Sequence, residues 1–177
     1  KTEVYLDVIE DMVSKRKKVL VLVPEIQQIP QMAQRLKSRF DRVAIYHSAL
    51  SKGERYDEYR SIIKDEVDLI LGTRSAVFLP IHHLGMIIID ESHDGSYQQQ
   101  EGVYYDAIEL AIERAKYHHI PIVLGSATPR IVDMYEAELK RYELLELTKR
   151  PFDLPLPTLH YVDMKEELKA KHYHIFS

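Results

Sequence analysis

The sequence predicts an α/β fold in which helices cover both faces of a mainly parallel sheet. Short apolar runs alternate along the chain with segments whose apolar residues recur at helical spacing, and this alternation is typical of βαβ units. The apolar runs also end abruptly in polar residues, as expected of buried strands whose carboxyl ends form a ligand-binding rim. With 177 residues, 45% of them apolar, the chain suits one domain with a sizeable core.

Five apolar runs have the length and composition of buried strands. They lie at residues 19–23, 43–46, 67–71, 86–89 and 121–124. Less regular runs predict a further strand at 142–147 and an edge strand at 158–162. We assign residues 1–150 to the domain and 151–177 to a linker and tail, because Pro151, Pro155 and Pro157 favour an extended chain.

Helical periodicity fills the segments between these strands. Helices are predicted directly after Thr2, at 29–40, 53–64 and 107–117, and from about 131 to 140. The first helix has a predicted apolar face made of Val4, Val8, Ile9, Met12 and Val13. The helix at 53–64 is expected to turn its larger apolar residues inward, namely Tyr56, Tyr59, Ile62 and Ile63.

Two acids at the end of one strand are the strongest chemical signal. Asp90 and Glu91 follow the apolar run 86–89 and precede Ser92 and His93. Magnesium prefers one or two carboxylates together with substrate phosphates, and a second acid beside it can orient water for attack on phosphorus. The alternative is a strand that ends in a solvated acidic turn, and the acids alone leave both interpretations open.

The first two residues suggest a partner for these acids. A phosphate-binding loop ends in Gly-Lys-[Ser/Thr] and leads directly into a helix. Lys1 and Thr2 stand immediately before the first predicted helix and match the last two residues of that motif. In an intact loop the lysine contacts the β- and γ-phosphates and the hydroxyl binds magnesium. A Lys-Thr start without this function is the alternative.

Charge and cysteine content narrow the possible functions. The net charge is −4, so nucleic acid would have to bind in a local groove rather than through an overall positive field. The basic run at 15–18 fits cations that complement the end of the first helix, and a contact with nucleic acid is the alternative. The chain has no cysteine, which excludes disulfides and thiolate metal sites. It also has no apolar run long enough for a membrane span.

The polar segments that follow the strands resemble a known family. Pro24-Glu25, 72–76, 90–93 and 125–129 are similar, in this order, to motifs Ia, Ib, II and III of the first motor lobe of superfamily 2 helicases. The resemblance is closest to the replication-restart DNA helicases and extends from Lys1 to about Met164. The sequence segments that carry this resemblance are 20–26, 47–51, 53–55, 72–80, 96–98 and 123–129.

This resemblance implies a RecA-like P-loop lobe of an ATP-driven, 3′-to-5′ DNA helicase that acts in replication restart and primosome assembly. It implies ATP and magnesium as cofactors, and zinc only in a second-lobe region outside this chain. It further implies single-stranded and forked DNA, restart proteins and single-strand-binding protein as partners, no membrane, and a bacterial cytoplasmic, nucleoid-associated location. The chain alone is expected to be inactive as an ATPase.

The resemblance also implies a role for individual residues. It assigns ATP and magnesium binding to Lys1, Thr2, Asp90 and Glu91, with Thr2 and Asp90 on the metal and with Glu91 activating water. It assigns coupling between the nucleotide site, DNA and the second lobe to His93, Ser126 and Thr128. Capping of the next helix by Ser126 and Thr128 is the other interpretation, and the two are compatible. The implied DNA path includes Pro24, Glu25, Thr73, Arg74 and Tyr97.

The segment around Tyr97 departs from the family pattern. It is rich in aromatic residues, with Tyr104 and Tyr105 nearby, and such rings can stack on exposed bases. The basic residues usual in the family are neutral or acidic here, so a packing role for Tyr104 and Tyr105 is an open alternative. For the whole chain, the alternatives are a lobe of another P-loop motor, such as an RNA helicase or a restriction-type translocase, or a fragment that only binds DNA or partners.

Overall fold

The computed structural model describes residues 1–148, 158–159 and 161–165. A compact unit comprises Lys1–Leu144, and a second unit comprises Leu145–Ser177. The predicted proline-rich linker lies largely outside the described residues, so the domain boundary at 150 stays a prediction. In the part of the chain that is described, no helix has the length and apolar character required to cross a membrane.

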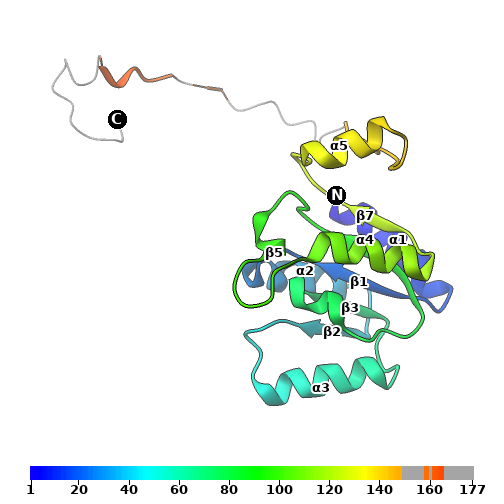
Figure 1. The fold of residues 1–177 in the computed structure, drawn as a ribbon. Helices are drawn as coiled ribbons and strands as arrows, with labels where there is room; N and C mark the ends of the chain where they lie inside the picture. Colours follow the sequence, from blue (N-terminus) through cyan, green and yellow to red (C-terminus); the bar gives the residue numbers. More distant parts are fainter. Residues whose placement is uncertain (149–157, 160, 166–177) are drawn as a thin grey trace. The chain divides into compact units, whose positions relative to one another are not determined.

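The compact unit is built on a five-stranded parallel sheet (Figure 1). Its strands lie side by side in the order β2-β3-β1-β4-β7, and every neighbouring pair is parallel. Every residue of β1, β3 and β4 is buried, which explains why these runs are apolar on both faces. The bounds are β1 Lys18–Leu22, β2 Val43–Tyr46, β3 Leu69–Gly72, β4 Leu84–Ile89 and β7 Ile122–Leu124.

Helices cover both faces of this sheet, as the sequence predicts. On one face, α1 (Thr2–Ser14) and α2 (Ile29–Lys37) pack against one set of strand side chains, including Val21 and Ile88. On the other face, α4 (Ala107–His118) packs against the alternate set, including Leu22 and Ile87. The remaining helices are α3 (Lys52–Ile63), beside the β2 edge in Figure 1, and α5 (Ile131–Glu138).

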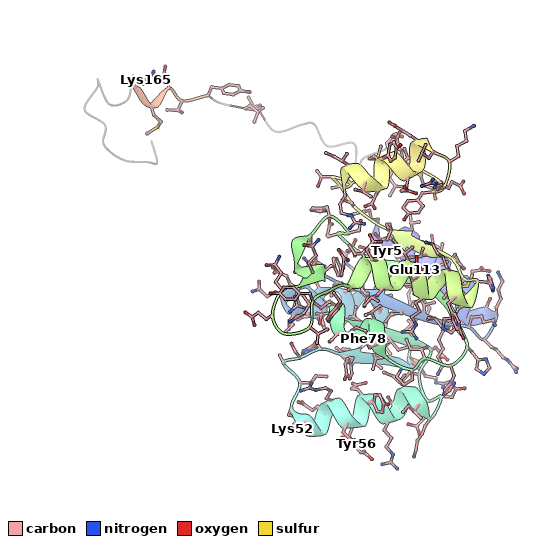
Figure 2. All side chains as sticks on the ribbon, viewed as in Figure 1. Tyr5, Lys52, Tyr56, Phe78, Glu113 and Lys165 are labelled. Atoms are coloured by element: carbon pink, nitrogen blue, oxygen red, sulfur yellow. The ribbon has the colours of Figure 1, made fainter. Side chains whose placement is uncertain are left out.

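Two predicted helix faces are wrong in part. In α1 the buried residues are Tyr5, Leu6 and Ile9, whereas Val4 is 46% exposed. In α3 only Ile62 is buried, because this helix contacts the edge strand β2 rather than the middle of the sheet. The other three residues predicted to point inward are exposed, among them the ring labelled on α3 in Figure 2: Tyr56, Tyr59 and Ile63.

Two predicted strands are absent from the described residues. Residues 143–148 have no regular structure, and Leu145 is 78% exposed. Residues 158–159 and 161–162 form no strand, while His160 lies outside the described part. Conversely, the sequence does not predict the short antiparallel pair β5 (Gln98–Gln99) and β6 (Tyr105–Asp106). This pair lies within the aromatic segment that follows the two acids, with Tyr97 just before β5 and Tyr105 in β6.

Candidate active site at the carboxyl edge of the sheet

Main-chain hydrogen bonds hold the two acids at the end of β4. The Asp90 N–H donates to the Leu22 carbonyl at 2.9 Å, which ties the acid to the end of β1. On the other side, the Gly125 N–H donates to the Ile89 carbonyl at 2.8 Å, and the Ser92 N–H donates to the Gly125 carbonyl at 2.9 Å. The segment after β4 is therefore fixed between the ends of β1 and β7.

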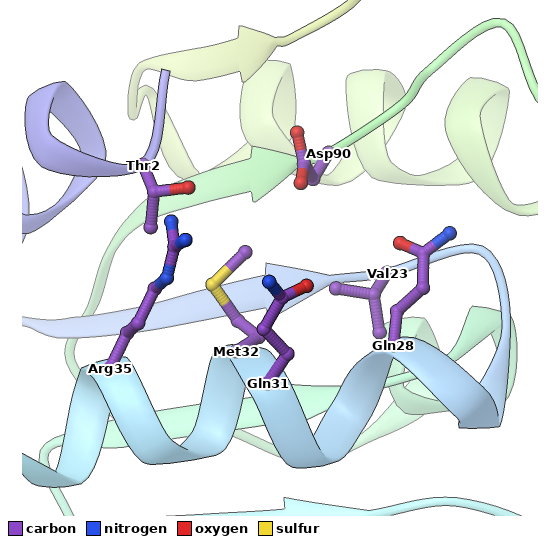
Figure 3. Close-up of a pocket in the computed structure, with 7 residues that line it drawn as sticks. All are labelled: Thr2, Val23, Gln28, Gln31, Met32, Arg35 and Asp90. Atoms are coloured by element: carbon purple, nitrogen blue, oxygen red, sulfur yellow. The ribbon is translucent and has the colours of Figure 1, made fainter.

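The start of α1 reaches the same edge. Lys1 Nζ lies 2.6 Å from Glu91 Oε1 and 3.7 Å from Asp90 Oδ1. Thr2 and Asp90 line one small cavity (Figure 3). The four residues predicted to bind ATP and magnesium, Lys1, Thr2, Asp90 and Glu91, thus lie together, while their roles stay predictions. Thr2 and Asp90 present a hydroxyl and a carboxylate, which are oxygen ligands of the kind that magnesium prefers.

Glu91 has a strained backbone, and its carboxylate lies between a lysine and a histidine side chain. Its φ angle is 46°, in the left-handed region that non-glycine residues rarely adopt. Its carboxylate lies between Lys1 and His93 Nδ1, which is 3.5 Å from Oε2. Backbone strain of this kind persists only where the surroundings fix it, and it is common at active sites.

The three predicted coupling residues form a connected group. His93 Nδ1 lies 2.8 Å from Ser126 Oγ, and the Thr128 N–H donates to the same hydroxyl oxygen at 3.0 Å. This group joins the end of β4 to the loop after β7. The alternative that Ser126 or Thr128 caps the next helix is wrong, because the residue at the N-cap of α5 is Arg130.

Tyr5 is a site residue that the sequence analysis missed. Its hydroxyl donates to Asp90 Oδ1 at 3.0 Å, and the residue is only 4% exposed. Burial and, to a lesser degree, the Asp90 charge raise the pKa of the Tyr5 hydroxyl well above its ordinary value. A Cβ added at Gly125 would lie 1.7 Å from this hydroxyl, so the glycine makes room for it. The indication available in the sequence was that this tyrosine stands among the predicted apolar positions of α1.

Tyr97 does not lie where the DNA prediction requires. Its ring is fully buried, and its hydroxyl lies 2.6 Å from the Asp90 carbonyl and 3.1 Å from the Leu22 carbonyl. Burial is the main reason that the pKa of Tyr97 is raised. A buried ring cannot stack on a base, so this structure offers no stacking surface at Tyr97, and its place in the DNA path stays a prediction.

Two of the other predicted DNA residues, Pro24 and Arg74, contact the 3-10 helix Gly95–Tyr97. Pro24 is buried, and its carbonyl accepts a hydrogen bond from Ser96 Oγ at 3.0 Å. Glu25 is exposed, whereas Thr73 is 7% exposed. Arg74 Nη1 donates to the carbonyls of Ser96 at 3.0 Å and Gln98 at 3.2 Å. Arg74 therefore braces this segment through carbonyls rather than through an acid, and its DNA contact stays a prediction.

Polar side chains of α2 and of Gln28, the residue just before it, complete the cavity in a way that the sequence did not indicate. Gln28, Gln31 and Arg35 face Thr2 and Asp90 across it (Figure 3). The cavity volume is about 60 Å³, and about 10–15 Å³ of such volume holds one water molecule. The volume is enough for a small ion with some of its waters, which is how magnesium usually binds. Its oxygen ligands would come from the Thr2 and Asp90 side of the cavity, since Arg35 on the facing wall carries a positive charge.

Known proteins share both the sequence and the fold. The family model described as DEAD/DEAH box helicase matches residues 1–136. Replication restart protein PriA of Bacillus subtilis (strain 168) is 50% identical over 100% of this chain and 22% of that protein. The PriA of Haemophilus influenzae is 38% identical over 94% of this chain and 23% of that protein. The chain thus spans less than a quarter of these relatives.

Solved structures agree on the architecture. S. cerevisiae Dbp5 bound to RNA and ADP BeF3 matches with a TM-score of 0.57 and 16% identity, over 86% of this chain and 38% of that chain. The Pyrococcus furiosus Hef helicase domain matches with a TM-score of 0.52 and 12% identity, over 77% of this chain and 28% of that chain. The predicted RecA-like fold is confirmed, and with its match over residues 1–136 the chain belongs to the DEAD/DEAH box helicase family.

Proposed function

We propose that this chain is the first motor lobe of an ATP-dependent DNA helicase of the replication-restart type. The similarity to PriA proteins supports the restart role. One observation carries the catalytic assignment: Lys1, Thr2, Asp90 and Glu91 meet at one edge of the sheet. In this proposal the full-length protein moves 3′ to 5′ on single-stranded or forked DNA. Its partners are restart proteins and single-strand-binding protein, and zinc binds outside this chain.

Each residue has a specific task in the proposed reaction. Phosphoryl transfer depends mainly on positioning and charge neutralisation. Thr2 and Asp90 would hold magnesium, which supplies positive charge to the phosphates when it is bound. Lys1 exchanges its ion pair with Glu91 for the β- and γ-phosphates. Glu91, released from Lys1, orients the attacking water and accepts its proton.

Glu91→Gln in the full-length protein tests this assignment. The amide cannot accept a proton from water, so DNA-stimulated ATP hydrolysis should fall by about 10²–10⁴-fold, the usual contribution of a general base. Binding of a labelled ATP analogue should stay near the parent value. Glu10→Gln, at an exposed position on α1, is the matched control and should hydrolyse ATP normally. Hydrolysis at the parent rate by the Glu91 variant would remove Glu91 from the reaction.

The kind of nucleic acid that stimulates ATP hydrolysis distinguishes a DNA helicase from the other motors. Single-stranded DNA should stimulate hydrolysis by the full-length protein more than RNA of the same sequence does. Stronger stimulation by RNA would indicate an RNA helicase, and stimulation by duplex DNA alone would indicate a translocase. If no nucleic acid stimulates hydrolysis but DNA still binds, the protein is a binding module.

A further inference from the structure

Two buried tyrosines converge on Asp90 from different elements. Tyr5 comes from α1 and Tyr97 from the 3-10 helix after β4. Both are almost fully buried, at 4% and 0% exposure. Neither has a task in the proposed phosphoryl transfer, yet both hydroxyl groups reach the proposed magnesium acid.

The Tyr5 hydroxyl makes the two oxygens of the Asp90 carboxylate different, because it bonds only one of them. Oδ1 accepts the Tyr5 hydroxyl hydrogen at 3.0 Å, and Lys1 Nζ lies 3.7 Å from the same oxygen. Oδ2 has no hydrogen-bond or ion-pair partner among the residues that the structure describes. One oxygen is therefore engaged by the protein, while the other is left for a ligand, and Asp90 lines a cavity together with Thr2.

The Tyr97 hydroxyl holds the main chain of the same residue. It lies 2.6 Å from the Asp90 carbonyl and 3.1 Å from the Leu22 carbonyl, so it links the ends of β4 and β1. Hydrogen bonds to the ligands of a metal orient them, and losing one such partner typically lowers metal affinity or activity about 10–100-fold. Two buried tyrosines thus hold both the side chain and the main chain of Asp90 in place.

We propose that Tyr5 and Tyr97 are positioning residues that present Asp90 Oδ2 to the divalent metal of the nucleotide site. This inference rests on the proposed function, because it takes Asp90 as the metal ligand. Tyr5 sets the rotation of the carboxylate, and Tyr97 sets the position of the main chain that carries it. Gly125 is part of the same arrangement, since a side chain there would displace the Tyr5 hydroxyl.

Metal affinity can be measured without turnover. Mn²⁺ is titrated into the full-length protein with a non-hydrolysable ATP analogue, and free Mn²⁺ is quantified by electron paramagnetic resonance. Tyr5→Phe removes only the hydroxyl and should weaken Mn²⁺ binding roughly tenfold. Tyr97→Phe should also weaken it. Tyr46→Phe is the matched control, because Tyr46 is partly buried against the core cluster that contains Tyr97, and it should bind Mn²⁺ as the parent does.

A second pair of measurements separates positioning from simple stability. In the Tyr5→Phe protein, kcat should return to near the parent value at saturating Mg²⁺, while half-saturation requires more metal. Unchanged Mn²⁺ affinity in both phenylalanine variants would overturn the inference, whatever happens to their melting temperatures. Asp90→Asn is measured alongside. If Asp90→Asn binds Mn²⁺ normally, the proposed function itself fails. If Asp90→Asn loses Mn²⁺ affinity while both tyrosine variants keep it, only the role of the tyrosines is refuted.

Discussion

At the scale of single residues, the burial of Tyr97 gives a direct test of where DNA binds. Tyr97→Phe should leave the affinity of the full-length protein for single-stranded DNA unchanged, because the ring is inaccessible. The lost hydroxyl should lower the free energy of unfolding by about 1 kcal/mol. Fluorescence anisotropy and urea denaturation measure the two effects. The exposed Tyr104 is the comparison: if its ring stacks on a base, Tyr104→Ala loses roughly 1–3 kcal/mol of binding.

Gly125 makes a second residue-scale prediction. Gly125→Ala should destabilise the fold by about 1–3 kcal/mol, as overpacking typically does, because the added Cβ would lie 1.7 Å from the Tyr5 hydroxyl. The same change in a Tyr5→Phe background should be less damaging. A double-mutant cycle from thermal unfolding checks this, and strictly additive effects would contradict the contact.

The acids of the site could be predicted from sequence, but the tyrosines that hold them could not. Asp90 and Glu91 follow a buried strand, so the fold fixes their place on the rim. Tyr5 bonds Asp90, and Tyr97 bonds Leu22, across long stretches of the chain. No local periodicity reports such a contact, and an aromatic ring beside a DNA motif suggests stacking as readily as burial.

At the scale of elements, the N-terminus of α3 depends on a capping box. Ser51 Oγ accepts from the Glu54 N–H, and Glu54 Oε2 accepts from the Ser51 N–H at 2.8 Å. Ser51→Ala should lower the free energy of unfolding by about 1 kcal/mol. Urea denaturation measures the loss. Ser38→Ala is the control, because its hydroxyl lies at the end of α2 and bonds the Arg35 carbonyl.

The same capping box gives a pH dependence. Hydrogen bonds from the Ser51 hydroxyl and N–H hold the pKa of Glu54 below its ordinary value of 4.5. The unfolded chain therefore binds this proton more readily than the folded protein does, and the contribution of Glu54 is fully present above that value. Stability should be lost as the pH falls through 4.5 and then through the lower folded pKa. Denaturation at several pH values should show a smaller decline for Glu54→Gln.

Other features of the elements show why the fold could be predicted better than its packing. The strands at the centre of the sheet are buried on both faces, so their runs are continuous and recognisable. Helix α3 packs mainly beside the edge strand β2, and its sequence offers several apolar residues of which Ile62 alone is buried. The run at 142–147 has strand-like composition, but no strand pairs with it among the described residues.

At the scale of the whole molecule, Arg74 tests whether this edge of the sheet meets DNA. With a net charge of −4, the chain depends on a local contact rather than on its overall field. Contacts to phosphate carry no sequence information, so Arg74→Ala in the full-length protein should weaken single-strand binding similarly on all sequences. The salt slope should decrease by a little under one unit, since about 0.7 counterions are released per neutralised phosphate.

Arg114 supplies the control for that measurement. Its guanidinium donates to the carbonyls of Val77 and Leu79 at 2.6 and 2.8 Å, so it braces a loop as Arg74 does. Arg114→Ala should lower the melting temperature and leave the salt slope unchanged. If Arg74→Ala behaves in the same way, Arg74 only braces Ser96 and Gln98, and it is not part of the DNA path.

The position of β1 in the sheet has a consequence for how the chain folds. Val19 pairs with Leu69 of β3, and Leu22 pairs with Ile89 of β4. Both strands that flank β1 are therefore synthesised much later than β1 itself. Such long-range parallel pairing folds slowly. At about 5–20 residues per second, an apolar strand in the middle of the finished sheet waits several seconds for its neighbours. During this time both edges of Lys18–Leu22 are unpaired, and apolar strand edges in that state are prone to aggregation.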